Sequence, residues 1–212
     1  MPHDDFAVEP IKGLPGVPPE GEDIVWQGAP NWWSLAKESL SLYWIFGYFV
    51  LLAVWRFTTV YDLVGTGRAL AATVPFVLSG LLACLILMLI AYVQAKSTVY
   101  TITTKRVVLR IGAAFTISLN LPYTKIISAS LGLRRDGTGN IALEVSETRQ
   151  LSYFILWPHV RPWKMSKPFP TLRCINEPER VAKLLAEAAQ TEVNMPQLGK
   201  EDPQSASIVA AE

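Results

Sequence analysis

The residues best suited to chemistry in this sequence form one short run, Trp157-Pro-His-Val-Arg-Pro-Trp163. Indole rings and a guanidinium are the side chains that most often anchor protein interfaces, and prolines hold a loop in shape at little loss of entropy. The run therefore predicts a recognition loop. A rigid corner, in which Trp157 and Trp163 plug the end of a barrel, explains the same residues and stays open as an alternative.

His159 lies in the middle of this run, and the chain's other histidine, His3, stands at the N-terminal end. An imidazole is a common ligand of metal ions, so His159 is a candidate ligand of a metal-containing group. A single histidine in a polar domain is more often a hydrogen-bonding group of a loop, and we favour that role. We expect no bound cofactor.

Basic residues extend the candidate contact surface beyond the tryptophans. Lys164 and Lys167 follow Arg161, and Arg134 and Arg135 flank a turn at Asp136 to Asn140. Such side chains can contact a phosphate, a lipid headgroup or an acidic partner protein. For the Arg134-Arg135 pair, a solvated turn is the competing interpretation.

Catalytic and metal-binding patterns are missing from the sequence. There is no Cys/His pair, no GxSxG, no phosphate-cradling glycine loop and no metal-ligand spacing. Cys84 and Cys174 are poorly placed to pair with each other and have no CxxC spacing. We therefore expect a protein that binds and is not an enzyme.

Charge is strongly segregated along the chain. Residues 1–38 carry net −5, residues 97–175 carry net +8, and residues 176–212 carry net −4. A basic module beside a bilayer is attracted to anionic headgroups by about 1 kcal/mol per well-placed Lys or Arg. An acidic protein patch is the alternative partner; no nucleic-acid-binding motif accompanies the charge.

Two apolar stretches predict a transmembrane hairpin within residues 31–96, with spans at about 39–60 and 70–93. Asn31 is expected to cap a helix that runs directly into the first span, and residues 57–68 are expected to form the turn. Lys and Arg residues follow the second span, which predicts that both termini lie in the cytoplasm.

Aromatic and basic side chains bracket the first span. Trp32 and Trp33 are expected at one membrane interface, and Trp55, Arg56 and Tyr61 at the other, with Arg56 reaching outward to the headgroups. The aromatic side chains inside this span face lipid by default, although packing on a pigment or on a partner helix is also open.

Beyond the hairpin, residues 97–190 alternate with period two and predict about seven antiparallel strands closed by a C-terminal helix. Asn176, Pro178 and Glu179 start that helix, and its apolar stripe should cover the sheets. Residues 1–30 and 191–212 read as extended or disordered, apart from a short edge strand at residues 23–27. The expected strands are 98–103, 106–111, 114–119, 125–131, 140–145, 151–157 and 171–175.

This order of elements resembles a pleckstrin-homology-like domain, and Tyr100-Thr-Ile-Thr-Thr-Lys-Arg106 is similar to the first hairpin of its bacterial version. The expected fold class is thus α+β: a transmembrane hairpin plus a pleckstrin-homology-like sandwich or barrel.

A second resemblance is more specific. The run 156–163, the run Pro170-Thr-Leu-Arg-Cys174 and the opening with Trp26-Gln-Gly resemble the PuhB family of photosynthetic-complex assembly proteins of purple bacteria. The resemblance implies a non-enzymatic assembly factor in the bacterial inner or intracytoplasmic membrane, whose partners are reaction-centre and core light-harvesting antenna subunits. In that setting His159 is a candidate axial ligand of the magnesium in a chlorophyll, a pigment ligand, although the hydrogen-bonding role stays favoured. Anionic lipids and a second copy of the chain are further possible partners. A lipid-binding or stress-sensing adaptor is the alternative, and a transporter subunit is disfavoured because the two spans carry no polar site at their middle.

Overall fold

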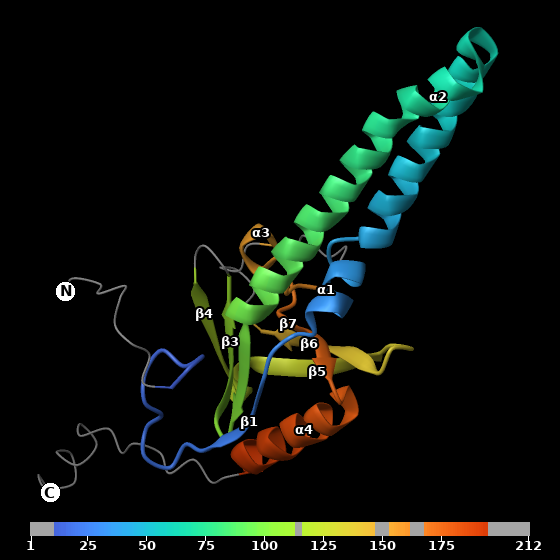
Figure 1. Ribbon diagram of the computed structural model, residues 1–212. Helices are drawn as coiled ribbons and strands as arrows, with labels where there is room; N and C mark the ends of the chain where they lie inside the picture. Colours follow the sequence, from blue (N-terminus) through green and yellow to red (C-terminus); the bar gives the residue numbers. More distant parts are fainter. Residues whose placement is uncertain (1–10, 113–115, 147–152, 162–167, 195–212) are drawn as a thin grey trace, which may run out of the picture.

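The computed structural model describes residues 11–112, 116–146, 153–161 and 168–194 (Figure 1). The expected disorder of residues 1–10 and 195–212 lies outside these ranges. Residues 11–28, expected to be largely extended or disordered, instead contact the domain: Leu14 is buried, and Glu22 forms an ion pair with Arg106 at 2.6 Å between carboxylate and Nε.

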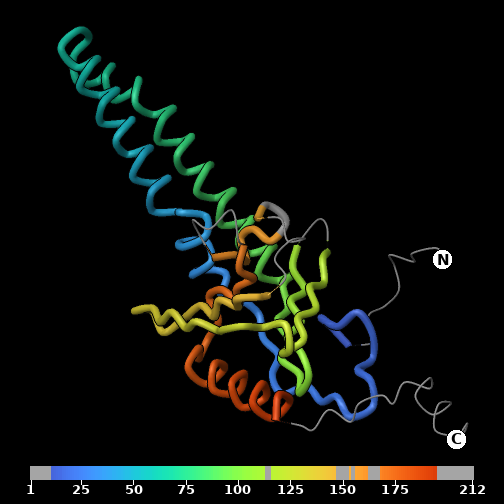
Figure 2. The backbone as a smooth tube through the Cα atoms, turned by 180° about the vertical axis from the view of Figure 1, so that it is seen from behind, coloured from blue at the N-terminus to red at the C-terminus, as the bar shows by residue number. Residues whose placement is uncertain are grey.

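The helical part begins with α1 (Trp32–Glu38) and continues with α2 (Leu42–Ser97). α2 reverses direction at Gly65, whose φ of 76° and ψ of 170° are not helical, so its two arms, residues 42–64 and 66–97, run side by side (Figures 1 and 2). By length and composition α2 is long and apolar enough to cross a membrane. Its most apolar stretch of 18 residues has a mean hydropathy of 2.7.

α1 is a separate helix, which corrects the expectation of one helix running from Asn31 into the first span. Asn31 does cap α1, because its Oδ1 accepts hydrogen bonds from the backbone N–H groups of Trp33 and Ser34, both at 3.1 Å. Ser41, however, adopts a left-handed conformation with φ of 54°, which ends helical geometry before α2 starts. The expected turn at residues 57–68 is also too long, since helix continues to either side of Gly65.

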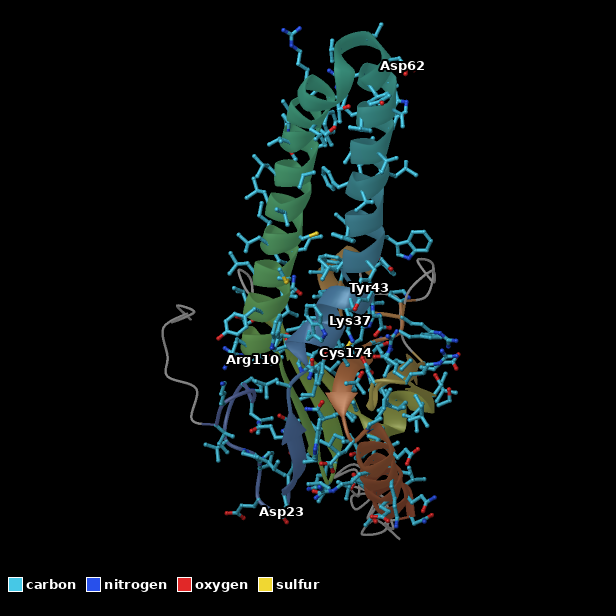
Figure 3. All side chains as sticks on the ribbon, turned by 45° about the vertical axis from the view of Figure 1, so that its right-hand side comes forward. Asp23, Lys37, Tyr43, Asp62, Arg110 and Cys174 are labelled. Atoms are coloured by element: carbon cyan, nitrogen blue, oxygen red, sulfur yellow. The ribbon has the colours of Figure 1, made fainter. Side chains whose placement is uncertain are left out.

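The two arms of α2 approach closely at Gly80. A Cβ added there would lie 2.7 Å from Cβ of Phe49 on the facing arm, so only glycine permits this packing. Large apolar side chains elsewhere on both arms point outward and are exposed, as Tyr43 illustrates in Figure 3.

The β-rich part contains two antiparallel sheets, in the orders β1-β2-β3-β4 and β5-β6-β7. The expected edge strand at residues 23–27 is confirmed as β1, which pairs with β2. The strands are β1 (Ile24–Gly28), β2 (Val99–Thr103), β3 (Arg106–Ile111), β4 (Ile117–Pro122), β5 (Ile126–Leu133), β6 (Thr138–Val145) and β7 (Thr171–Asn176).

The final helix, α4 (Pro178–Asn194), closes the core formed by both sheets. Val181 and Leu185 are buried in the same cluster as Tyr100, Leu109 and Leu143, so the predicted apolar stripe covers the sheets as expected. A short 3-10 helix, η1 (Tyr123–Lys125), links the sheets between β4 and β5.

Two expected strands need correction. Residues 151–157 were expected to pair as a strand, but the described part forms a short helix, α3 (Tyr153–Leu156), whose end is closed by a hydrogen bond from Trp157 N to Tyr153 O at 3.0 Å. The free side of β6 is already taken by β7, so no edge remains there for this segment. The strand expected at 114–119 lies three residues later, as β4.

Candidate functional site at the junction of helices and sheets

The expected recognition run, residues 157–163, contains both exposed and buried residues in the structure. Trp157 is 43% exposed and Arg161 is exposed, so both can contact a partner. His159, between them, is 1% exposed, and Trp163, Lys164 and Lys167 lie outside the described residues. The surface available for contact thus begins immediately after α3.

His159 is a buried, hydrogen-bonded residue, the role favoured above over pigment ligation, and it is therefore not part of the exposed contact surface on which it was expected. Its Nε2 lies 3.1 Å from Thr98 Oγ1, and its Nδ1 lies 2.6 Å from the Tyr100 hydroxyl. Burial, with a smaller contribution from the nearby Arg173, lowers the pKa of His159 to about 3, so the imidazole is neutral. Both ring nitrogens are occupied, and the ring is not accessible from solvent.

Arg173 of β7 holds the same loop from the other side. Its Nη1 donates hydrogen bonds to the carbonyls of Pro158, at 3.1 Å, and Val160, at 3.4 Å. Its backbone N–H donates to the Tyr100 hydroxyl at 3.2 Å. The loop that presents Trp157 and Arg161 is therefore fixed to β2 and β7.

Glu38, the last residue of α1, is the acceptor at the centre of the junction. Its Oε1 lies 2.6 Å from Arg173 Nη2 and 2.5 Å from Arg134 Nη2, and it accepts from Asn140 Nδ2 at 2.9 Å. Burial alone would raise the pKa of Glu38, but the charge and hydrogen bonds of Arg173, helped by Cys174 and Arg134, outweigh it and lower the pKa overall. α1 is thereby joined to β6, β7 and the β5–β6 hairpin.

Cys174 belongs to this network as a donor. Its thiol donates to Glu38 Oε2 at 3.2 Å, and burial, together with the Glu38 carboxylate, raises the pKa of the thiol to about 12. A thiol that stays protonated is a poor nucleophile and a poor metal ligand. Its role at the junction is to hydrogen bond.

A second contact joins α1 to the tip of the β5–β6 hairpin. Asp136 Oδ2 accepts from Lys37 Nζ at 3.1 Å and from Ser34 Oγ at 3.0 Å. A hydrogen bond from Thr138, followed by those from Lys37 and Ser34, lowers the pKa of Asp136 well below its usual range. Figure 3 places Lys37 and Cys174 together at the base of the arms.

The basic pair at this hairpin therefore has two different environments. Arg134 is committed to Glu38, whereas Arg135 is exposed at the turn. Of this pair, Arg135 fits the interpretation of a solvated turn, whereas Arg134 has a structural partner.

A cleft of about 270 Å³ opens beside the network. It is lined by Arg161, Arg173 and Glu38 together with polar and small residues of β5, β6 and β7. Arg161 is its exposed cation, because Arg173 is already engaged with Glu38. The cleft can accept a small polar or anionic group. Within the described ranges, no group of three or more His, Cys, Asp or Glu residues is placed to hold a metal ion.

Aromatic and basic side chains gather where the arms meet the domain. The ring of Trp32 lies 6.2 Å from that of Tyr92, Lys37 Nζ lies 5.9 Å from the Trp33 ring, and Lys96 Nζ lies 5.8 Å from the Tyr92 ring. Trp55, Arg56 and Tyr61 are exposed on the first arm, nearer to Gly65. Their contact with a membrane interface stays a prediction.

Sequence reasoning missed the junction itself. In the sequence, Glu38 is simply the last charged residue before an apolar span, and Arg173 is one of many basic residues in a basic domain. A usable signal was present, because Arg173 interrupts a strand that is otherwise buried, and a buried guanidinium needs a carboxylate or several carbonyl groups. Its partner, 135 residues earlier, is not visible in the sequence.

One family model and several known proteins resemble this chain. The family model described as "Bacterial PH domain" matches residues 39–189. An "Uncharacterized 23.7 kDa protein in puhA 5'region" of Rhodobacter capsulatus is 42% identical over the full length of both chains. A crystal structure of a DUF1696 family protein with a pleckstrin-homology domain from Shewanella loihica covers 43% of this chain and 71% of its own, with 14% identity and a TM-score of 0.29. With antiparallel sheets closed by a helix and a family match across most of its length, the chain belongs to the bacterial PH domain family.

Proposed function

We propose that this protein is a non-enzymatic, membrane-anchored assembly factor for the photosynthetic reaction centre and its core light-harvesting antenna. The observation that carries the proposal is the firm attachment of a PH-like domain to the base of a long, apolar and outwardly exposed helical element. A protein built in this way can hold a binding surface at a constant place beside membrane subunits while they assemble.

The dimensions of α2 support insertion of both arms into the bilayer. Tyr43 and Tyr61 are 18 residues apart on the first arm, which corresponds to about 27 Å of helix and is close to the ~30 Å hydrocarbon core. Within the most apolar 18-residue stretch of α2, only 11% is buried inside the protein. Lipid is the environment that such side chains favour.

The charge distribution supports a cytoplasmic location of the domain. Lys96 ends the second arm and Lys105 and Arg106 follow soon after it, whereas Arg68 lies in the segment after Gly65. Lys and Arg next to membrane spans are retained on the cytoplasmic side. In this orientation Trp157 and Arg161 lie on the domain surface in the cytoplasm, available to the cytoplasmic ends of membrane subunits.

The photosynthetic assignment rests on likeness. The relative from Rhodobacter capsulatus is named by its position in the puhA 5' region, and the two chains match from end to end. The run at residues 156–163 also resembles the PuhB family of assembly proteins. We extend the role of that family to this chain.

Deletion of the gene in a phototrophic host tests this function. We expect lower amounts of assembled reaction centre and core antenna, measured by absorption of membranes and by native electrophoresis, with recovery when the full chain is supplied. Unchanged amounts of both complexes in the deletion strain would refute the assembly role while leaving the membrane anchoring open.

A lipid-headgroup adaptor is the second candidate function, favoured by the cleft beside Arg161. Because the chain is anchored independently of headgroup binding, the test uses the full chain in nanodiscs with and without anionic lipid. If the domain binds headgroups, anionic lipid should protect residues 157–161 from hydrogen exchange, and added salt should remove that protection. Equal exchange in neutral and anionic nanodiscs would reject this candidate.

A further inference from the structure

Strand β5 leaves one side of its sheet open. Among the described residues β5 pairs only with β6, and all residues from Ile127 to Leu133 are exposed, Ile127 at 65% and Leu133 at 57%. The strand has eight residues and contains neither a charge nor a proline. An exposed, uncharged edge of this length is a template for the addition of another strand.

An apolar groove follows this open edge. It has a volume of about 260 Å³ and is lined on one side by β5, including Ile127 and Leu131, and on the other by α4, including Ala186, Ala189 and Val193. Figures 1 and 2 both show α4 running beside β5. A strand added to β5 would therefore place every second side chain over an apolar surface.

We propose that residues 204–211 of this same chain bind the β5 edge as an added strand. The segment reads Gln-Ser-Ala-Ser-Ile-Val-Ala-Ala, which has eight residues and, like β5, no charge and no proline. Ala206, Ile208 and Ala210 alternate and form one apolar face, which suits the groove. Backbone hydrogen bonds to β5 supply the pairing that a short segment lacks by itself.

The flanking charges select this segment over a second copy of β5. Bases bracket β5, with Lys125 before it and Arg135 after it, and acids bracket the segment, with Glu201-Asp202 before it and Glu212 after it. Opposite charges therefore meet at both ends in either strand direction. Two β5 strands would place bases against bases at both ends, which disfavours pairing between copies.

The length of the intervening chain also fits. α4 ends at Asn194, and Val193 already lines the groove next to Tyr123 and Ile126 at the start of β5. Nine residues, 195–203, remain before the segment, and they span up to ~30 Å. That reach covers the ~27 Å length of an eight-residue strand, so the segment can meet β5 without moving α4.

Hydrogen exchange of the full chain in detergent, read on peptides that contain residues 126–133, tests the proposal. We expect the outward-facing amides of β5 to exchange at least tenfold faster after truncation following Asn194, and after Ile208→Pro, because proline removes a ladder hydrogen bond. Leu198→Pro, in the connecting residues, is the matched control and should leave the exchange of β5 unchanged.

Each alternative outcome overturns the proposal in a defined way. Identical β5 exchange in the full and truncated chains shows that the segment does not bind the edge. Protection of the truncated chain that grows with protein concentration assigns the edge to a second copy. The test does not depend on the assembly function, because it needs no photosynthetic partner.

Discussion

Glu38 at the end of α1 and Arg173 in the middle of β7 form an ion pair of 2.6 Å across the junction between helices and sheets. The Arg173 side chain is only 5% exposed and that of Glu38 only 10%. Removal of one partner from a buried pair leaves the other charge buried without a counter-charge. The free-energy cost of that buried charge is larger than the net stabilisation that the intact pair provides.

Glu38→Gln should therefore lower the free energy of unfolding by about 3 kcal/mol. Urea unfolding of the protein in detergent, followed by tryptophan fluorescence, measures the change. Glu179→Gln, at an exposed position in the first turn of α4, is the control and should change stability by under about 1 kcal/mol. Equal effects of the two substitutions would show that the junction does not depend on this ion pair.

The buried imidazole of His159 makes stability depend on pH. Below about pH 6.5 the unfolded chain binds a proton on this histidine, whereas the folded protein, with the pKa of His159 lowered to about 3, does not. His159 should therefore contribute a loss in the free energy of unfolding of about 1.4 kcal/mol per pH unit as the pH drops from 6 to 4, in addition to the loss from carboxylates whose pKa values are lowered. His159→Gln lacks this titration, and its unfolding curves at the same pH values should show a smaller slope. A slope equal to that of the unsubstituted protein would contradict the assignment.

Close approach of the α2 arms at Gly80 should limit the side chains allowed there. Gly80→Leu places a side chain where Phe49 already packs, so we expect a loss of about 2 kcal/mol, typical of overpacking, and a lower thermal midpoint in detergent. Gly47 lies in the same helix with no atom within 4 Å of an added Cβ. Gly47→Leu should leave the midpoint unchanged or raise it, and a similar loss at both positions would argue against close packing of the arms.

The exposed residues after α3 provide the functional prediction. In the deletion strain, a chain carrying both Trp157→Ala and Arg161→Glu should restore less than about half of the reaction-centre complex that the unsubstituted chain restores, because a few aromatic and arginine anchors carry most interface energy. Immunoblots of membranes should show equal amounts of both chains. Lys183→Glu, a comparable charge reversal on exposed α4, should restore the complex fully. Full restoration by the Trp157/Arg161 variant would locate the contact elsewhere.

Alternation of apolar residues was sufficient to predict most strands. β2, β3, β6 and β7 lie where period-two patterns occur, and α4 begins at Pro178, as the local signals predicted. The predicted cap is wrong, however, because Asn176 is the last residue of β7 and Glu177 directly precedes the helix. The strand predicted at residues 151–157 is wrong because a short apolar run fits a strand or a helix equally well, and its described part forms α3.

The candidate site was harder to predict because contacts between distant segments determine which of its residues are exposed. Trp157 and Arg161 are exposed as a recognition run requires, but His159 is buried by contacts with Thr98 and Tyr100, about sixty residues earlier in the chain. Likewise, the left-handed conformation of Ser41 lies between Ala36 of α1 and Leu42 of α2, which pack in one cluster with Ala91 of the second arm. Contacts between distant segments decide these features, and no local pattern records them.

The way in which α2 joins the domain has a consequence for how partners are reached. One arm passes into β2 through the single residue Thr98, and the other begins three residues after α1, which Glu38 and Lys37 hold against the sheets. With both ends of α2 attached without a flexible linker, the domain cannot swing or extend toward a distant target. If α2 spans a bilayer as proposed, the helices set the distance of the domain from the membrane surface and its orientation, and a partner must then reach the domain by diffusion within the membrane.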